Sequence, residues 1–115
     1  MTRPWTPHRA ISAASDNATL VRAGRTRLGL ISINNINAAA RYLHLFDKAT
    51  APTTGTDTPK ITIPLAGASA VSIALDEGMM FELGLGYTIT TTIAAGAGNV
   101  SANEHVVSLG YAGIS

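Results

Sequence analysis

The chain has 115 residues, a length that fits one domain, with 46% hydrophobic and only 13% charged residues. It has no cysteine, which excludes disulfides, thiolate metal sites and cysteine nucleophiles, and no stretch near the roughly 18 apolar residues needed to span a bilayer. The net charge is +1, but residues 1–48 hold seven basic and two acidic side chains, and residues 49–115 hold one basic and five acidic. This polarity favours contact with copies of itself or with a charged partner, or simply keeps a sheet surface soluble.

The first 17 residues are predicted to form an extended arm outside any sheet. Pro4 and Pro7 each remove a backbone donor and disfavour helix in the residue before them. Trp5 is the one large apolar side chain of the arm, either folded back onto its own domain or placed on a neighbour. Because the start also lacks the apolar run of a signal peptide, we expect synthesis in a reducing cytoplasm. The chain is thus divided into an arm, residues 1–17, and a sheet domain, residues 18–115.

Beyond the arm, short segments that alternate apolar and polar residues predict β-strands, since successive side chains of a strand point to opposite faces. Two of them carry further signals. Residues 28–34 change the phase of their alternation, which indicates a bulge or burial of both faces. Pro64 cannot donate to a ladder and predicts an edge strand. The expected strands cover residues 19–23, 28–34, 41–47, 61–65, 71–75, 81–93 and 105–111.

The segment 41–47 has apolar residues on both faces, so we expect a strand that is central or covered on two sides. Residues 76–78, Asp-Glu-Gly, predict a turn. The longest alternation follows as a strand or strand pair with a dry face at its odd positions and a wet face at its even positions. The dry face comprises Phe81, Leu83, Leu85, Tyr87, Ile89, Thr91 and Ile93.

Many short strands separated by turn signals, with no helical stretch of ten residues, predict an all-β fold. The architecture that we expect is an antiparallel β-sandwich or jelly roll with an extended N-terminal arm. This is the strongest inference that the sequence supports.

Candidate reactive side chains are few and scattered. His8, His44 and His105 are far apart in sequence, and none has a partner two or four residues away. His44 lies between two leucines of a strand and is expected to be a partly buried histidine with its hydrogen bonds satisfied. Because a metal site needs three or four donors, and the sequence assembles none, we expect no metal site, no catalytic residue and no cofactor. The sequence therefore favours a protein that is not an enzyme.

Arginines dominate the basic half of the chain. Arg22, Arg25 and Arg27 form a short cluster, and Arg3 and Arg9 lie in the arm. Single-stranded nucleic acid would also require exposed aromatic side chains for stacking, and most aromatic residues fall at expected core positions. The cluster is therefore interpreted as a basic patch at a turn and sheet edge, open to self-contact, rather than as a nucleic-acid site.

Two segments resemble small virion-associated β-sandwich proteins of tailed bacteriophages. They are residues 41–67, RYLHLFDKATAPTTGTDTPKITIPLAG, and residues 84–91, GLGYTITT. In such proteins a strand that ends in aromatic-Asp-Lys leads through a Pro/Thr/Gly loop into an Ile-Pro-Leu strand. The resemblance extends over about residues 19–111. It implies a structural role on the particle, as a capsid decoration or cement protein on the virion surface, and it transfers no site residues because the matching segments are strands and turns.

A cement protein of this kind would bind the major capsid protein, and Arg3, Trp5 and Arg9 of the arm are the expected partner contacts. A homo-oligomer, dimer or trimer, is reasonable for a lattice protein, with the edge near Pro64 and the segment 25–30 as candidate self-contacts.

Two other functions stay open. A tail or neck component of the same particle is indistinguishable by sequence. A carbohydrate-binding host-adhesion module would require an exposed aromatic platform, for which Tyr87 and Tyr111 are the candidates.

Overall fold

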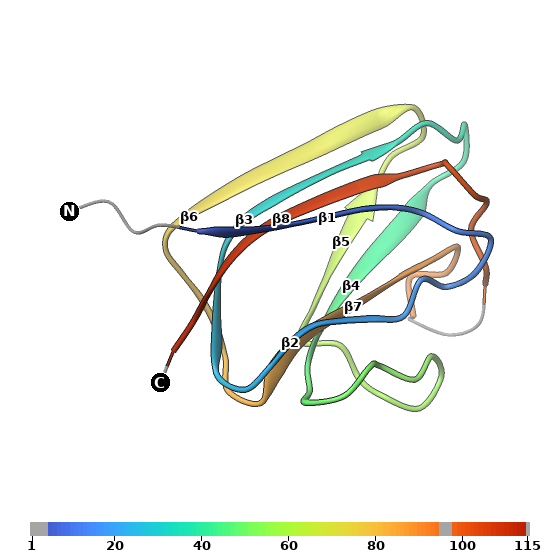
Figure 1. Ribbon diagram of the computed structural model, residues 1–115. Coiled ribbons are helices and arrows are strands. Elements are labelled where there is room, and N and C mark those ends of the chain that lie inside the picture. The colour runs from blue at the N-terminus through green and yellow to red at the C-terminus, as the bar shows by residue number, and fades with distance from the viewer. Residues whose placement is uncertain (1–4, 95–97, 115) are drawn as a thin grey trace.

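Two facing β-sheets make up the protein, as Figure 1 shows for the computed structural model, which describes residues 5–94 and 98–114. This part of the chain has eight strands, and it contains no helical segment with the length and hydropathy of a membrane span. The predicted all-β sandwich of antiparallel sheets is confirmed. The strands are β1 (Thr6–Ile11), β2 (Thr19–Ala23), β3 (Thr26–Asn35), β4 (Arg41–Asp47), β5 (Ile61–Leu65), β6 (Ser69–Phe81), β7 (Gly84–Thr90) and β8 (Val106–Gly113).

The first sheet has the strand order β1-β8-β3-β6, and the second sheet has the order β2-β7-β4-β5. Every pairing is antiparallel. The pairs are nested in the sequence, since β1 lies beside β8, β2 beside β7, β3 beside β6 and β4 beside β5. Figure 1 shows the first sheet above the second, with β6 at its outer edge. As expected, β4 is central, and β5, which contains Pro64, lies at an edge.

The core fills the space between the inner faces of the two sheets. It forms because alternate residues of each strand point inward, so Ile31 and Ile33 of β3 face the same interior as Leu43 and Leu45 of β4. The other fully or nearly fully buried apolar residues of this cluster are Leu28, Ile63, Leu65, Phe81, Leu85, Tyr87, Ile89, Val100, Val107 and Leu109.

The change of phase in β3 is a bulge. The pairing of β3 with both neighbours shifts between Leu28 and Leu30, which leaves Gly29 out of the ladder. A Cβ atom added to Gly29 would overlap the indole ring of Trp5. Trp5 is therefore folded back onto its own domain, and the absence of a side chain at Gly29 provides the space for its ring.

The expectation that the first 17 residues lie outside the sheet is wrong for Thr6–Ile11. These residues form β1 and pair with β8 from Thr6 opposite Tyr111 to Ile11 opposite Val106. Pro7 is compatible with this strand because β1 is an edge strand, with β8 as its one neighbour among the described strands. The polar, proline-containing sequence of this edge strand is also what an extended arm would have, so composition alone does not distinguish the two.

The expected turn at residues 76–78 is also wrong. The chain continues as one strand from Ser69 to Phe81, and the three residues instead form an irregularity within it. Between Ala74 and Met79, β6 advances five residues while β3 advances only two. Gly78 permits this detour because its φ is +82°, a conformation that glycine adopts without strain.

The long alternation of residues 81–93 contains one strand, β7, flanked by the end of β6 and by connections, and its two faces differ from the prediction. Leu83 and Ile93, expected on the dry face, are 59% and 67% exposed, because they lie in the connections on either side of β7. All seven residues of β7 are buried, including the even positions expected to be wet. The loop after β4 covers part of that outer surface, with the ring of Pro52 close to Gly86.

Candidate interaction surface and buried polar clusters

The outer face of the first sheet carries small and mostly uncharged side chains. These residues face outward because they alternate with core residues such as Ile31 and Leu109. The register aligns them in rows across all four strands. One row consists of Pro7, Gly110, Leu30 and Ala74, and the next of Arg9, Ser108, Ser32 and Ser72. Apart from Leu30 and Arg9, the side chains in both rows are short, so another protein surface can approach this face closely.

Apolar and basic groups border these rows. Ile11 is 48% exposed and Leu30 is 38% exposed. Trp5 is partly buried where its side chain lies against Gly29 and Gly110, and Arg9 is exposed. Of the residues expected to bind a partner, Trp5 and Arg9 are thus brought onto one face, while Arg3 lies outside the described residues.

The predicted basic cluster is close together in sequence, but each arginine has a different neighbour. Arg22 donates to the carbonyl oxygen of Ala23 at 3.0 Å. Arg25 pairs with Glu82 at 3.1 Å, an ion pair in which both side chains are at least half exposed. Arg27 donates to the carbonyl oxygen of Glu77 at 3.0 Å. The contacts of Arg25 and Arg27 tie the β2–β3 turn and β3 to the connection after β6 and to the irregular part of β6, whereas Arg22 bonds within its own strand.

His44 and the threonines around it form a buried polar cluster on the outer side of the second sheet. The Oγ1 of Thr90 donates to the carbonyl oxygen of Thr92 at 2.8 Å, so it accepts from Nε2 of His44 at 2.9 Å. Nδ1 of His44 then accepts from the hydroxyl of Thr62 at 2.8 Å. Burial lowers the pKa of His44 against the opposing effect of the Thr92 carbonyl. The prediction of a histidine with satisfied hydrogen bonds is confirmed.

A second histidine connects the two sheets. His8 of β1 points inward, and its Nε2 lies 3.1 Å from the hydroxyl of Tyr87 of β7, with the two rings edge to face. Burial lowers the pKa of His8 and raises the pKa of Tyr87, on which a hydrogen bond with Thr19 acts in the opposite direction. Both shifts favour the neutral forms of a polar pair that lies between the sheets.

The most heavily charged buried cluster was not predicted from the sequence. Glu104, 4% exposed, accepts from Nδ2 of Asn37 at 2.6 Å and from Nε of Arg41 at 2.9 Å. Its other contact is Nε2 of His105 at 2.9 Å, and Nδ1 of His105 lies 3.0 Å from the carbonyl oxygen of Asn34. Burial alone would raise the pKa of Glu104, but the hydrogen bonds from Asn37 and Arg41 and the adjacent positive charge hold it below its usual value.

Ser12, Glu104 and His105 together have the residue types of a catalytic triad but not its geometry. Oγ of Ser12 accepts from the backbone N–H groups of Glu104 and His105 and donates to the carbonyl oxygen of Ser101. Both ring nitrogens of His105 are directed at other acceptors, so neither contacts Ser12. In a triad the histidine must take the proton of the nucleophile. This cluster therefore fastens the start of β8 to the ends of β1 and β3.

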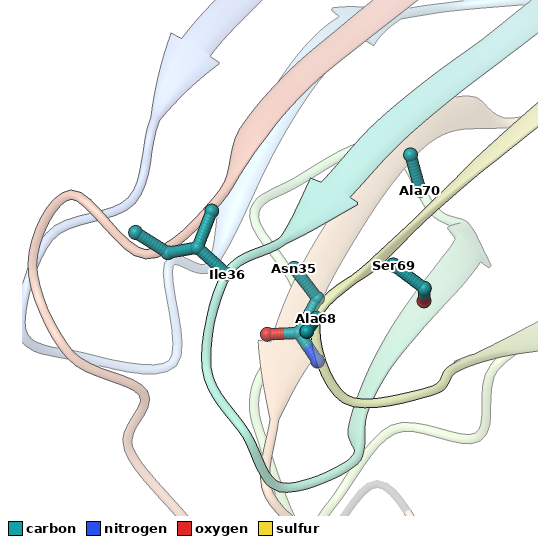
Figure 2. A pocket seen from close by; sticks show the side chains of 5 residues that line it. All are labelled: Asn35, Ile36, Ala68, Ser69 and Ala70. Atoms are coloured by element: carbon teal, nitrogen blue, oxygen red, sulfur yellow. The ribbon is translucent and has the colours of Figure 1, made fainter.

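A shallow depression lies where β3 ends and β6 begins (Figure 2). Its lining is mainly small and apolar, and Ile36 on its rim is 67% exposed. Among the described residues no group of three histidine or acidic side chains is arranged to hold a metal ion. The lining residues are Asn35, Ile36, Ala68, Ser69 and Ala70.

No protein-family model, curated protein or solved structure matches the chain.

Proposed function

We propose that the chain is a structural virion protein, a capsid decoration or cement protein of a tailed bacteriophage that binds the major capsid protein and stabilises its lattice. Made in the host cytoplasm, it would occupy the outer surface of the capsid. The proposal rests on the resemblance of residues 41–67 and 84–91 to such proteins and on the outer face of the first sheet. That face carries exposed Ile11 and Leu30 beside Arg9 among short side chains, which suits repeated contact with a regular protein surface.

The sandwich is further proposed to be a jelly roll. Jelly rolls have eight strands in two sheets and are common in viral capsid proteins and lectins. The nested pairs of this chain support the assignment. They are the pairs that arise when one long antiparallel hairpin with four strands in each arm is wound into two sheets, with β4 and β5 at its tip.

The capsid role is tested by the occupancy of the protein on expanded capsids that lack it, measured by sedimentation and by electron cryomicroscopy. The double variant Arg9→Glu and Ile11→Ser alters the outer face of the first sheet without changing the core. We expect it to weaken binding about tenfold or more, which corresponds to about 1.4 kcal/mol.

Ile93→Ser is the control, because Ile93 is also an exposed isoleucine but follows β7 of the second sheet. It should bind like the unchanged protein. Full occupancy by the double variant would remove this face from the proposal. Density for the chain only at the tail or neck of the particle would replace the capsid role by the alternative of a tail component.

The carbohydrate-binding alternative has less support. Tyr87 is 1% exposed and packs in the core, and Tyr111 is partly buried against the core. Neither forms the exposed aromatic platform that a sugar ring would need.

A further inference from the structure

The four sheet edges of the sandwich are not equally protected. The strand orders place β1 and β6 at the edges of the first sheet, and β2 and β5 at those of the second. β1 carries Pro7 and Arg9, β5 carries Pro64, and β2 is a five-residue strand with Arg22 and an irregular register. Proline, charge, shortness and irregularity all hinder the addition of a further strand.

The first half of β6 has none of these devices. From Ser69 to Leu75 its sequence is SAVSIAL, without charge or proline. Residues 69–74 pair with β3 in an unbroken register, and no other strand of the described chain pairs with β6. A regular edge strand presents unpaired N–H and C=O groups along its free side. Val71 and Ile73 are also only partly buried, although they pack against the core, so a neighbour beside β6 would bury them further.

The same segment is nearly symmetric about Ser72. Ala70 and Ala74 lie two residues to either side, and Val71 and Ile73 lie one residue to either side. If two copies pair antiparallel about a twofold axis at Ser72, alanine meets alanine and one β-branched residue meets another. Such cross-strand pairs are favourable, and an interface on a twofold axis must be complementary to itself.

Charge does not oppose this pairing. The acidic residues Asp76 and Glu77 lie beyond the paired segment, so the two copies hold them at opposite ends of the ladder. In the dimer, Asp76 and Glu77 of each copy lie opposite the segment around Ala68 of the other copy. Ala74 of each copy lies opposite Ala70 of the other, at the rim of the depression in Figure 2.

We propose that β6 is a dimerisation edge, at which two copies of this chain pair antiparallel about Ser72 and join their first sheets into one eight-stranded sheet. The proposal is independent of the virion role. A ladder of seven residues buries less than the roughly 800 Å² per partner of a standard interface, so we expect a dimer that dissociates at about micromolar concentrations. This edge replaces the region near Pro64 and the segment 25–30 as the site of self-contact.

Cross-linking tests the register directly, because the chain has no cysteine of its own. In the proposed dimer the two copies of residue 72 are directly opposite, about 4.5–5.5 Å apart at Cα, a separation that a disulfide can bridge. Ser72→Cys should therefore form a covalent dimer under mild oxidation. Ala70→Cys is the matched control, because its two copies are offset along the ladder, and it should cross-link at least tenfold more slowly.

Sedimentation velocity over a concentration series tests the dimer without covalent trapping. Ser72→Lys places two positive charges together at the axis and should weaken dimerisation tenfold or more, whereas a mixture of Ser72→Lys with Ser72→Asp should restore it. Ile11→Lys adds the same charge to the other edge of the first sheet and should leave the dimer intact. A protein that stays monomeric at hundreds of micromolar, a dimer unaffected by Ser72→Lys, or equal cross-linking of the two cysteine variants would each overturn the proposal.

Discussion

At the scale of single residues, polar side chains and not only apolar ones determine how the ends of the strands are held. Asp47 shows this on the surface, where its carboxylate accepts from the backbone N–H groups of Leu83 and Glu82 at 2.7 and 3.0 Å. It thereby satisfies donors in the short connection by which the chain passes from β6 to β7. Glu104 has the same role in the interior, where it joins Asn37, Arg41 and His105.

Glu104→Gln should reduce the free energy of unfolding by about 3 kcal/mol near neutral pH, because the substitution leaves Arg41 and His105 beside a neutral group in a buried site. Chemical denaturation monitored by circular dichroism measures the change. Glu82→Gln is the control, since the ion pair of Glu82 with Arg25 is exposed to solvent and contributes at most a few tenths of a kcal/mol. Equal effects of the two substitutions would contradict a special role for the buried cluster.

At the scale of elements, the bulge in β3 and the strand that follows Trp5 depend on each other. Gly29 leaves a gap in the outer face of the first sheet, and the indole ring of Trp5 fills it. This contact fixes the point at which the chain enters β1, an edge strand held by β8 on one side only.

Gly29→Ala should displace the ring of Trp5, and since this is the one tryptophan in the chain, its fluorescence reports the change. We expect emission at longer wavelength, faster quenching by acrylamide and a loss of about 1–2 kcal/mol of stability. Ser32→Ala, three residues further along β3, should leave the emission unchanged. A spectrum of Gly29→Ala identical to that of the unchanged protein would mean that the indole does not depend on this gap.

Strands with a clear alternation of apolar and polar residues could be predicted from the sequence. Burial or pairing that depends on distant parts of the chain could not. The change of phase at Leu28–Ile33 indicated the bulge because a shift of one residue moves apolar side chains to the other face. The even positions of β7 were expected to be wet, but the loop that covers them comes from elsewhere in the chain. Edge strand β1 has too little apolar pattern to distinguish it from an arm.

The candidate sites show the same limit. The sequence predicts Trp5 and Arg9 as partner contacts from their types and their place in an expected arm, and their common face follows only from the pairing of β1 with β8. The Glu104 cluster joins residues from positions 12 to 105, and nothing local in the sequence connects them. One signal was available. It was the adjacency of Glu104 and His105, two polar residues at the start of a strand with an apolar pattern.

At the scale of the whole molecule, the ionisable groups make the fold sensitive to acid. Burial lowers the pKa values of His8 and His44 from 6.5. For Asp47 and Glu104 burial acts in the opposite direction but is outweighed by hydrogen bonds and nearby cations, so these pKa values also fall below their ordinary 3.8 and 4.5. In each case the unfolded chain binds protons more readily than the folded protein.

Stability should therefore decrease as the pH falls, first below about pH 6.5 as the histidines of the unfolded chain take up protons, and again below about pH 4.5 as its carboxylates do so. Denaturation midpoints measured from pH 8 to pH 3 provide the test. His44→Gln should flatten the first part of the profile and leave the second unchanged. A protein that becomes more stable between pH 7 and pH 5 would contradict the direction of the histidine shifts.

The partnership between β1 and β8 has a consequence for how the protein is made. β1 must wait for β8, the last strand of the sandwich, before it can pair, and β2 must likewise wait for β7. Among neighbouring strands, only β4 and β5 are consecutive in the chain and can pair early. A nascent chain is therefore expected to remain open until β8 has been synthesised and then to close from the β4–β5 turn outward, with β1 and β8 joining last.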